Sequence, residues 1–179
     1  MTGHEGLDMS FLAAIPYPGG FGIDGFMQGL VIRLRRRGLR LGGVVQHNDP
    51  LCADRCMAMS LEDLGSGTRF PISQDLGAAA QGCRLDAAGL AAASAAFEGA
   101  LATRADLVLV NRFGKQEALG EGLRGEVAKT LLAGLPVLIA VRRDFLPAWR
   151  DFAGGDWCEL PVDEAAVERW VLDALRIVA

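Results

Sequence analysis

Residues 11–46 read FLAAIPYPGGFGIDGFMQGLVIRLRRRGLRLGGVVQ, and this stretch decides the fold. The apolar run Phe11–Tyr17 predicts a buried strand, and a glycine-rich turn follows it. Asp24 is a candidate N-cap for an amphipathic helix over Gly25–Arg37, which ends at a glycine. A second apolar strand is expected over Leu39–Gln46. The stretch is therefore a β-turn-α-β unit.

The rest of the chain repeats this alternation of apolar strands and helices, which favours an α/β fold with a parallel-type sheet covered by helices on both faces. We expect a single domain over residues 1–179, with residues 1–10 frayed and an ordered loop over Gln74–Arg84. The further elements predicted are an inserted hairpin (Cys56–Leu64 and Thr68–Ile72), helices over 86–104, Glu121–Ala133, Asp144–Phe152 and Asp163–Val178, and strands over Asp106–Asn111, Pro136–Val141 and Trp157–Leu160.

Composition excludes several classes of protein. Hydrophobic residues make up 51% of the chain, enough for a core, and the formal net charge of -4 argues against binding nucleic acid through a basic surface. No uninterrupted apolar stretch is long enough for a membrane span, and residues 1–10 do not resemble a signal peptide. Four scattered cysteines do not suit a disulfide scaffold, so we expect a cytoplasmic protein with reduced thiols.

The turn after the first strand has the glycine spacing of a phosphate-binding loop, G-x-x-x-x-G-K-[ST]. Residues 20–25 (GFGIDG) supply both glycines, but Phe26 and Met27 stand where lysine and a hydroxyl belong. A helix N-terminus that can bind an anion would remain, with Asp24 weakening it. A purely structural turn is the alternative. In either case Phe26 is expected to pack into the core from the apolar face of the helix.

A second segment follows the strand that begins at Asp106. Residues 111–117 read NRFGKQE, which resembles the Asp-Glu-Ile-Gly-Lys-Met-Glu of a small prokaryotic nucleoside-triphosphatase family of the P-loop class. That resemblance implies a metal-supporting acid at Asn111 and a catalytic base at Arg112, and neither residue can do that work. Gly114, Lys115 and Glu117 match, although a solvated loop at a strand end is the alternative reading.

Five short segments, one of them part of the stretch just quoted, carry a second resemblance that covers residues 11–178. GGVVQ (42–46), PISQDLG (71–77), GCRLD (82–86), NRFGK (111–115) and FAGG (152–155) are similar to an uncharacterised bacterial family, domain of unknown function 2478. Its members resemble the nucleoside-triphosphatases with degenerate motifs and are often associated with molybdenum through neighbouring molybdate-transport functions. The resemblance therefore implies a P-loop-like fold and a link to molybdenum metabolism.

The thiols and one arginine pair are further candidates. His47, Asp49, Cys52 and Cys56 lie within ten residues and could hold a metal, although small loop or core thiols are the alternative. Cys83 precedes an arginine that would lower its thiol pKa, so it could bind a thiophilic metal or an oxyanion.

Arg142 and Arg143 follow an apolar strand, where two guanidinium groups would suit phosphate or molybdate, or would simply be solvated.

Three hypotheses remain open. The first is a non-catalytic or weakly catalytic protein that binds a nucleotide or an oxyanion such as molybdate, with Mg²⁺ not expected. The second is an active nucleoside-triphosphatase in which Lys115 replaces the missing loop lysine. The third is an adaptor, either monomeric or homodimeric, that uses the fold as a scaffold. The first hypothesis places the ligand against Gly20, Gly22, Asp24, Gly25, Asn111, Lys115, Arg142 and Arg143.

Overall fold

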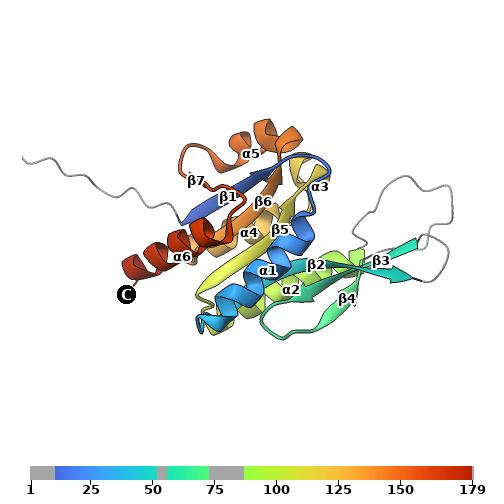
Figure 1. Cartoon of the computed structure of the whole chain (residues 1–179), viewed down its shortest axis with the longest axis horizontal. Coiled ribbons are helices and arrows are strands. Elements are labelled where there is room, and N and C mark those ends of the chain that lie inside the picture. Colours follow the sequence, from blue (N-terminus) through green and yellow to red (C-terminus); the bar gives the residue numbers. More distant parts are fainter. Residues whose placement is uncertain (1–10, 52–55, 73–86, 179) are drawn as a thin grey trace, which may run out of the picture.

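A computed structural model describes residues 11–51, 56–72 and 87–178 of the chain. The elements, labelled in Figure 1, are β1 (Leu12–Tyr17), α1 (Ile23–Arg36), β2 (Leu41–Leu51), β3 (Cys56–Asp63), β4 (Arg69–Pro71), α2 (Ala87–Thr103), β5 (Leu107–Phe113), α3 (Lys115–Ala118), α4 (Arg124–Leu132), β6 (Val137–Arg142), a 3-10 turn η1 (Arg143–Phe145), α5 (Leu146–Ala153), β7 (Cys158–Glu159) and α6 (Glu164–Val178).

The strands form one seven-stranded sheet in the order β4-β3-β2-β5-β6-β1-β7. From β2 to β7 all neighbours are parallel, whereas β3 and β4 run antiparallel at one edge. The predicted α/β fold with a parallel core and an inserted hairpin is thus confirmed. Because the parallel strands share one direction, their carboxyl ends lie along the same end of the sheet. Ligands bind at that end in such folds.

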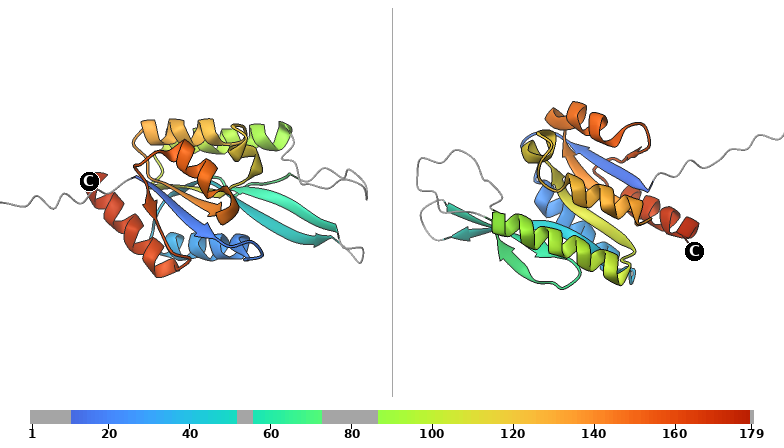
Figure 2. Two further views of the ribbon diagram at one scale, coloured as in Figure 1. Left: turned by 90° about the horizontal axis from the view of Figure 1, so that it is seen from above. Right: turned by 180° about the vertical axis from the view of Figure 1, so that it is seen from behind.

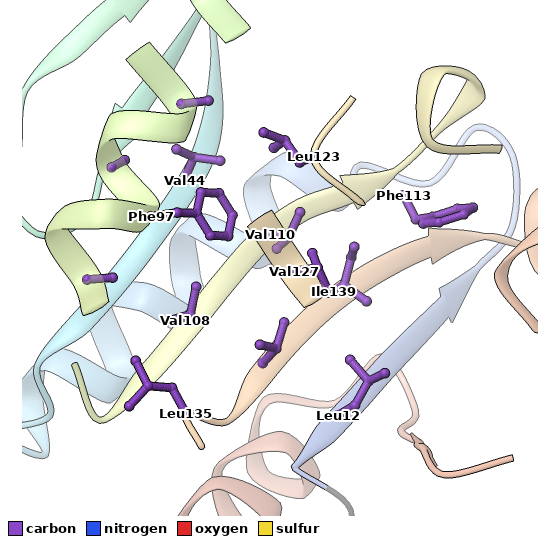
Figure 3. Close-up of a cluster of buried hydrophobic side chains, with 14 of the residues drawn as sticks. Leu12, Val44, Phe97, Val108, Val110, Phe113, Leu123, Val127, Leu135 and Ile139 are labelled. Atoms are coloured by element: carbon purple, nitrogen blue, oxygen red, sulfur yellow. The ribbon is translucent and has the colours of Figure 1, made fainter. Parts of the chain in front are cut away.

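Helices cover both faces of the sheet (Figure 2). Successive strand residues point to opposite faces, so Ala14 of β1 packs in the cluster with α2, α4 and α5, while Ala13 and Ile15 pack in the cluster with α1 and α6. Figure 3 shows the first cluster, where the Phe97 ring lies beside Val44 and points toward Val110. Within the described part of the chain, no helix combines the length and apolar character needed to cross a membrane.

The hairpin region is larger than predicted. The strand expected over Leu39–Gln46 continues to Leu51, because its polar second half pairs antiparallel with β3. Its pairing with β5 ends at Val44 opposite Val110. Beyond that point the ribbon of β2 and β3 projects away from the rest of the sheet (Figures 1 and 2). The strands β2 and β5 therefore part shortly before β5 ends at Phe113, while β2 continues to Leu51 beside β3.

Helix α1 differs from the prediction at its start. It begins at Ile23, and its buried face is made by Ile23, Met27, Leu30, Val31 and Leu34. Phe26 is half-buried at the margin of this face and packs against the same cluster and the ring of Phe21. The fully buried position expected for Phe26 belongs to Met27, whose burial stabilises the fold by roughly 1.5–3 kcal/mol.

Candidate functional site

The glycine spacing predicted that the turn between β1 and α1 ends at Gly25, but the helix begins two residues earlier. The helix begins at Ile23, so Gly25 lies in its first turn, and the N–H of Phe26 already donates to the carbonyl of Gly22 at 3.3 Å. Gly20, with a φ of 80°, is the turn residue that needs the left-handed region. The first-turn positions that face the strand ends are therefore Ile23 and Asp24, not Phe26 and Met27.

Asp24 is not the N-cap that the sequence predicted. Gly22 occupies that position, and no side chain caps the helix there. Instead the Asp24 carboxylate accepts hydrogen bonds from three side chains of the strands β2 and β5. The donors are Asn48 Nδ2 at 2.6 Å, Asn111 Nδ2 at 2.8 Å and Arg112 Nη2 at 2.8 Å. Residues far apart in the sequence thus meet on one carboxylate.

Asn111 is 3% exposed and bridges the parting strands. Its Oδ1 accepts the backbone N–H of Gln46 at 2.8 Å, which replaces the strand pairing that ended at Val44. Since a backbone N–H can only donate, this bond fixes the amide so that Nδ2 must point at Asp24. Asn48 is oriented in the same way, because its Oδ1 accepts from Gln46 Nε2 at 2.9 Å. Both amides are committed as donors to the carboxylate.

Arg112 lies in an irregularity of β5, where the register with β6 shifts between Val110 and Phe113. Such a bulge re-aims side chains, and here it turns the Arg112 guanidinium to Asp24. Nη2 lies 2.8 and 3.0 Å from the two carboxylate oxygens. The Nε atom is buried and has no hydrogen-bond partner among the described residues. One end of the guanidinium is therefore held while the other keeps unused donors.

Asp24, Asn111 and Arg112 line a hollow of about 1120 Å³ at the carboxyl ends of the strands, which we call the strand-end hollow. Its other charged lining residues are Lys115, Glu117, Glu121 and Arg142, and Val44, Leu61, Ile72 and Leu90 give it an apolar wall. Tyr17 also lines it. Burial raises the pKa of the Tyr17 phenol, and the Asp24 carboxylate raises it further against the opposing effects of Arg112 and Arg142.

Lys115 is the first residue of the short helix α3 and is exposed on the wall of this hollow. The Lys115 ammonium has no ion-pair or hydrogen-bond partner within the described ranges. Glu117 has a structural role, because its carboxylate accepts the backbone N–H of Gly114 at 2.9 Å and that of Leu123 at 3.2 Å. A Cβ at Gly122 would lie 2.2 Å from this carboxylate, so that glycine is required.

Arg142 and Arg143, the two candidate arginines, line different hollows. Arg142 lines the strand-end hollow, stacks over the Phe145 ring at 4.7 Å and has its Nε 2.9 Å from Asp144, an ion pair without hydrogen-bond alignment. Arg143 is exposed and lines a second hollow of about 480 Å³ beside the β7 segment. The expectation that both arginines reach one crevice is therefore wrong for Arg143. Gly25 is likewise absent from the lining of the strand-end hollow.

The thiol candidates give no described metal site. Cys83 and Cys52 lie outside the described residues, and Cys56 opens β3 without a described side chain. His47, which was grouped with them, places Nε2 2.7 Å from a Glu62 carboxylate oxygen instead. In the described ranges, no three His, Cys, Asp or Glu side chains gather closely enough to hold a metal ion.

Six of the predicted ligand-binding residues lie in the lining of the strand-end hollow, and their role in binding stays a prediction: Gly20, Gly22, Asp24, Asn111, Lys115 and Arg142. Sequence reasoning treated Arg112 only as a lost base and did not consider Tyr17, Gln46 or Asn48. The polar residues that follow the apolar half of β2 could have indicated Gln46 and Asn48. Polar side chains at the carboxyl end of a parallel strand lie where ligands bind in such folds.

Comparison with known proteins identifies the class. A human cancer-related nucleoside triphosphatase, solved in solution, matches 93% of this chain and 96% of its own, with a TM-score of 0.61 and 17% identity. The chain therefore has the fold of the P-loop nucleoside triphosphatases. It belongs to the family described as "Protein of unknown function (DUF2478)", which it matches over residues 12–170.

One curated relative is much longer. The molybdenum import ATP-binding protein ModC 2 of Bradyrhizobium diazoefficiens is 40% identical over 167 residues, which is 93% of this chain. The chain spans only about a fifth of that relative, 19% of its length. The similarity thus concerns one segment of a larger protein.

The P-loop fold implies a Mg²⁺ ion held by a loop hydroxyl and a strand-end acid. The residues present do not fit that ion. The Asp24 carboxylate already accepts from two amide N–H groups and a guanidinium, and the Glu117 carboxylate, which also lines the hollow, accepts two backbone N–H groups. A divalent cation would have to displace donors that point at the same oxygens and sit beside a positive charge.

Proposed function

We propose that the chain binds a nucleotide or a small oxyanion in the strand-end hollow without hydrolysing it. The observation that carries this proposal is the pairing of Asp24 with Asn111 and Arg112. An amide and a guanidinium cannot take a proton from an attacking water, because neither has a basic atom available. The two positions that align with the metal-supporting acid and the catalytic base therefore support binding without hydrolysis, and the hollow still has cationic side chains in its lining.

Anion binding is supported by the position and lining of the hollow. It lies where parallel α/β sheets bind ligands, and Lys115 presents an ammonium without a described partner. Its volume of about 1120 Å³ is at the upper end of small-molecule pockets, so it would accept a nucleotide as well as a single oxyanion.

A role in molybdenum metabolism is the second part of the proposal. It is supported by the printed name of the relative, a molybdenum import ATP-binding protein, of which this chain resembles one segment. We infer that the chain acts in the handling of molybdate in the cytoplasm. Self-association as a homodimer stays a prediction that sedimentation of the purified chain would test.

Calorimetric titration tests the proposal directly. The purified chain is titrated with ATP, ADP, AMP, phosphate and molybdate, and phosphate release from ATP is followed in parallel. We expect saturable binding of at least one probe and no phosphate release above background. Release that disappears in Lys115→Ala would establish the active nucleoside-triphosphatase instead, and the absence of any binding would favour the adaptor.

A further inference from the structure

We propose that the Arg112 guanidinium is the built-in cation of the strand-end hollow, where it receives one tetrahedral anion group without a divalent metal. The anion group is a free oxyanion or a phosphate monoester. This inference rests on the proposed function and adds to it the residue that binds, the class of anion and the independence from Mg²⁺.

The contacts of Arg112 leave donors for a ligand. A guanidinium has five N–H donors, and the described contacts to Asp24 use only Nη2. Nε is buried without a partner among the described residues, although the Arg112 side chain as a whole is 39% exposed in the hollow. A buried donor without an acceptor costs free energy. The exposed part of the guanidinium carries N–H groups that Asp24 does not use, and an oxyanion in the hollow can accept from them.

Asp24 is the positioning residue for this cation. Its carboxylate is 17% exposed and is held by Asn48 and Asn111, whose amides are themselves fixed by Gln46. The guanidinium is therefore held against one edge of the carboxylate with its free edge directed elsewhere. This arrangement preorganises a planar, charged donor, as Arg does at phosphate sites.

The charges that line the hollow limit the anion to a single group. Among the described residues, three cations (Arg112, Lys115 and Arg142) and three carboxylates (Asp24, Glu117 and Glu121) line the hollow, so the formal charge of this described lining is zero. A phosphate monoester brings about −1.5 to −2 charges. Each further phosphate of a triphosphate adds negative charge, and the described residues supply no fourth cation to the lining of the hollow. The neutral Tyr17 phenol adds a donor rather than a charge, because burial raises its pKa.

The test is calorimetric titration of wild-type protein and Arg112→Gln with molybdate, phosphate, AMP and ATP, each in EDTA and in Mg²⁺. For wild type, we expect a single-anion probe to bind equally in both buffers, within about twofold, and more tightly than ATP. Arg112→Gln weakens that binding about tenfold or more, which is about 1.4 kcal/mol. Binding of molybdate and phosphate alone identifies a free oxyanion as the ligand, whereas binding of AMP alone identifies a phosphate monoester.

Asp24→Asn separates positioning from folding. The amide keeps an acceptor for the guanidinium but removes the opposing charge, so the affinity for the anion rises and its salt dependence steepens. A purely structural role for Asp24 would change the melting temperature alone. If Arg112→Gln does not fold, the double variant D24N/R112Q removes both charges of the pair together, and its anion affinity is expected to be about tenfold or more below that of Asp24→Asn.

Three results overturn the inference while leaving the proposed function intact. They are wild-type binding that requires Mg²⁺, wild-type binding that prefers ATP, and binding that survives in Arg112→Gln or D24N/R112Q. Failure of every probe to bind the wild-type chain overturns the proposed function and this inference together.

Discussion

The strand pair β2–β5 has a closed half and an open half, and they differ in what their residues do. In the closed half, Gly42 and Gly43 leave no space: a Cβ would lie 2.3 Å from the Ala100 Cβ at Gly42 and 2.0 Å from the Leu109 carbonyl oxygen at Gly43. In the open half the strands part after Val44, and polar side chains replace backbone pairing.

The difference shows how one pair of strands supports both folding and a site. Close packing makes the closed half sensitive to one added methyl group. The open half instead holds a carboxylate, two amides and a guanidinium in a network beside a hollow. Substitutions in the closed half should act on stability alone, and those in the open half should act on ligand or cation binding.

The largest effect is expected from Gly43→Ala in the closed half. The residue has a φ of 84°, and the new Cβ meets the backbone of a neighbouring strand that cannot move aside. We expect the free energy of unfolding, measured with urea, to fall by about 3 kcal/mol or more. The matched control is Gly99→Ala in α2, where nothing lies within 4 Å, and it should stabilise by about 0.4–1 kcal/mol. A tolerated Gly43→Ala would show that the closed half can relax.

Asn111→Asp converts the open half into a cation-requiring site. The new carboxylate oxygen faces Asp24 at the present 2.8 Å contact, because the Gln46 N–H holds the other oxygen. In EDTA at pH 7 we expect a loss of about 1–3 kcal/mol of stability, which Mg²⁺ or a lower pH partly restores. Thermal melts with and without Mg²⁺ measure this. Asn111→Ala, which loses the donor without adding charge, should not respond to Mg²⁺, and an equal response of both variants would refute the mechanism.

Lys115→Met should weaken binding of phosphate or molybdate about tenfold, or about 1.4 kcal/mol. The melting temperature should barely change, since an exposed lysine contributes little to stability. The chain offers one matched control, its second lysine: Lys129 lies on α4 and pairs with Glu98 at 3.4 Å. Lys129→Met should leave the affinity unchanged. The opposite result, lost stability with full affinity, would make Lys115 structural.

The smallest effect concerns the pH dependence set by Tyr17. Burial raises the pKa of its phenol above the usual 10.0. The folded chain therefore holds this proton more tightly than the unfolded chain, and the free energy of unfolding falls as the pH rises above 10. Tyr17 is the only tyrosine, so phenolate absorbance follows it without ambiguity. Tyr17→Phe should flatten the alkaline part of the profile, and an unchanged profile would assign that loss to other groups.

Much of the fold could be predicted from the sequence, because apolar strands and amphipathic helices are local patterns. The start of α1 could not, since a glycine spacing does not say which glycine ends the turn. The second half of β2 is polar and becomes a strand only by pairing with β3, which is a tertiary effect. The meeting of Asp24 with Arg112 joins residues 88 positions apart, so only the fold brings them together.

The claim under test is that Arg112 binds an anion without a divalent metal. Its most direct test is nuclear magnetic resonance of the Arg112 side-chain Nε–H during a molybdate or phosphate titration in EDTA. The signal is assigned by its loss in Arg112→Lys. If Arg112 receives the anion without a metal, the signal shifts saturably with the probe, and adding Mg²⁺ changes neither the shift nor the midpoint. A signal that stays fixed while the probe binds, or that moves only when Mg²⁺ is present, would contradict the claim.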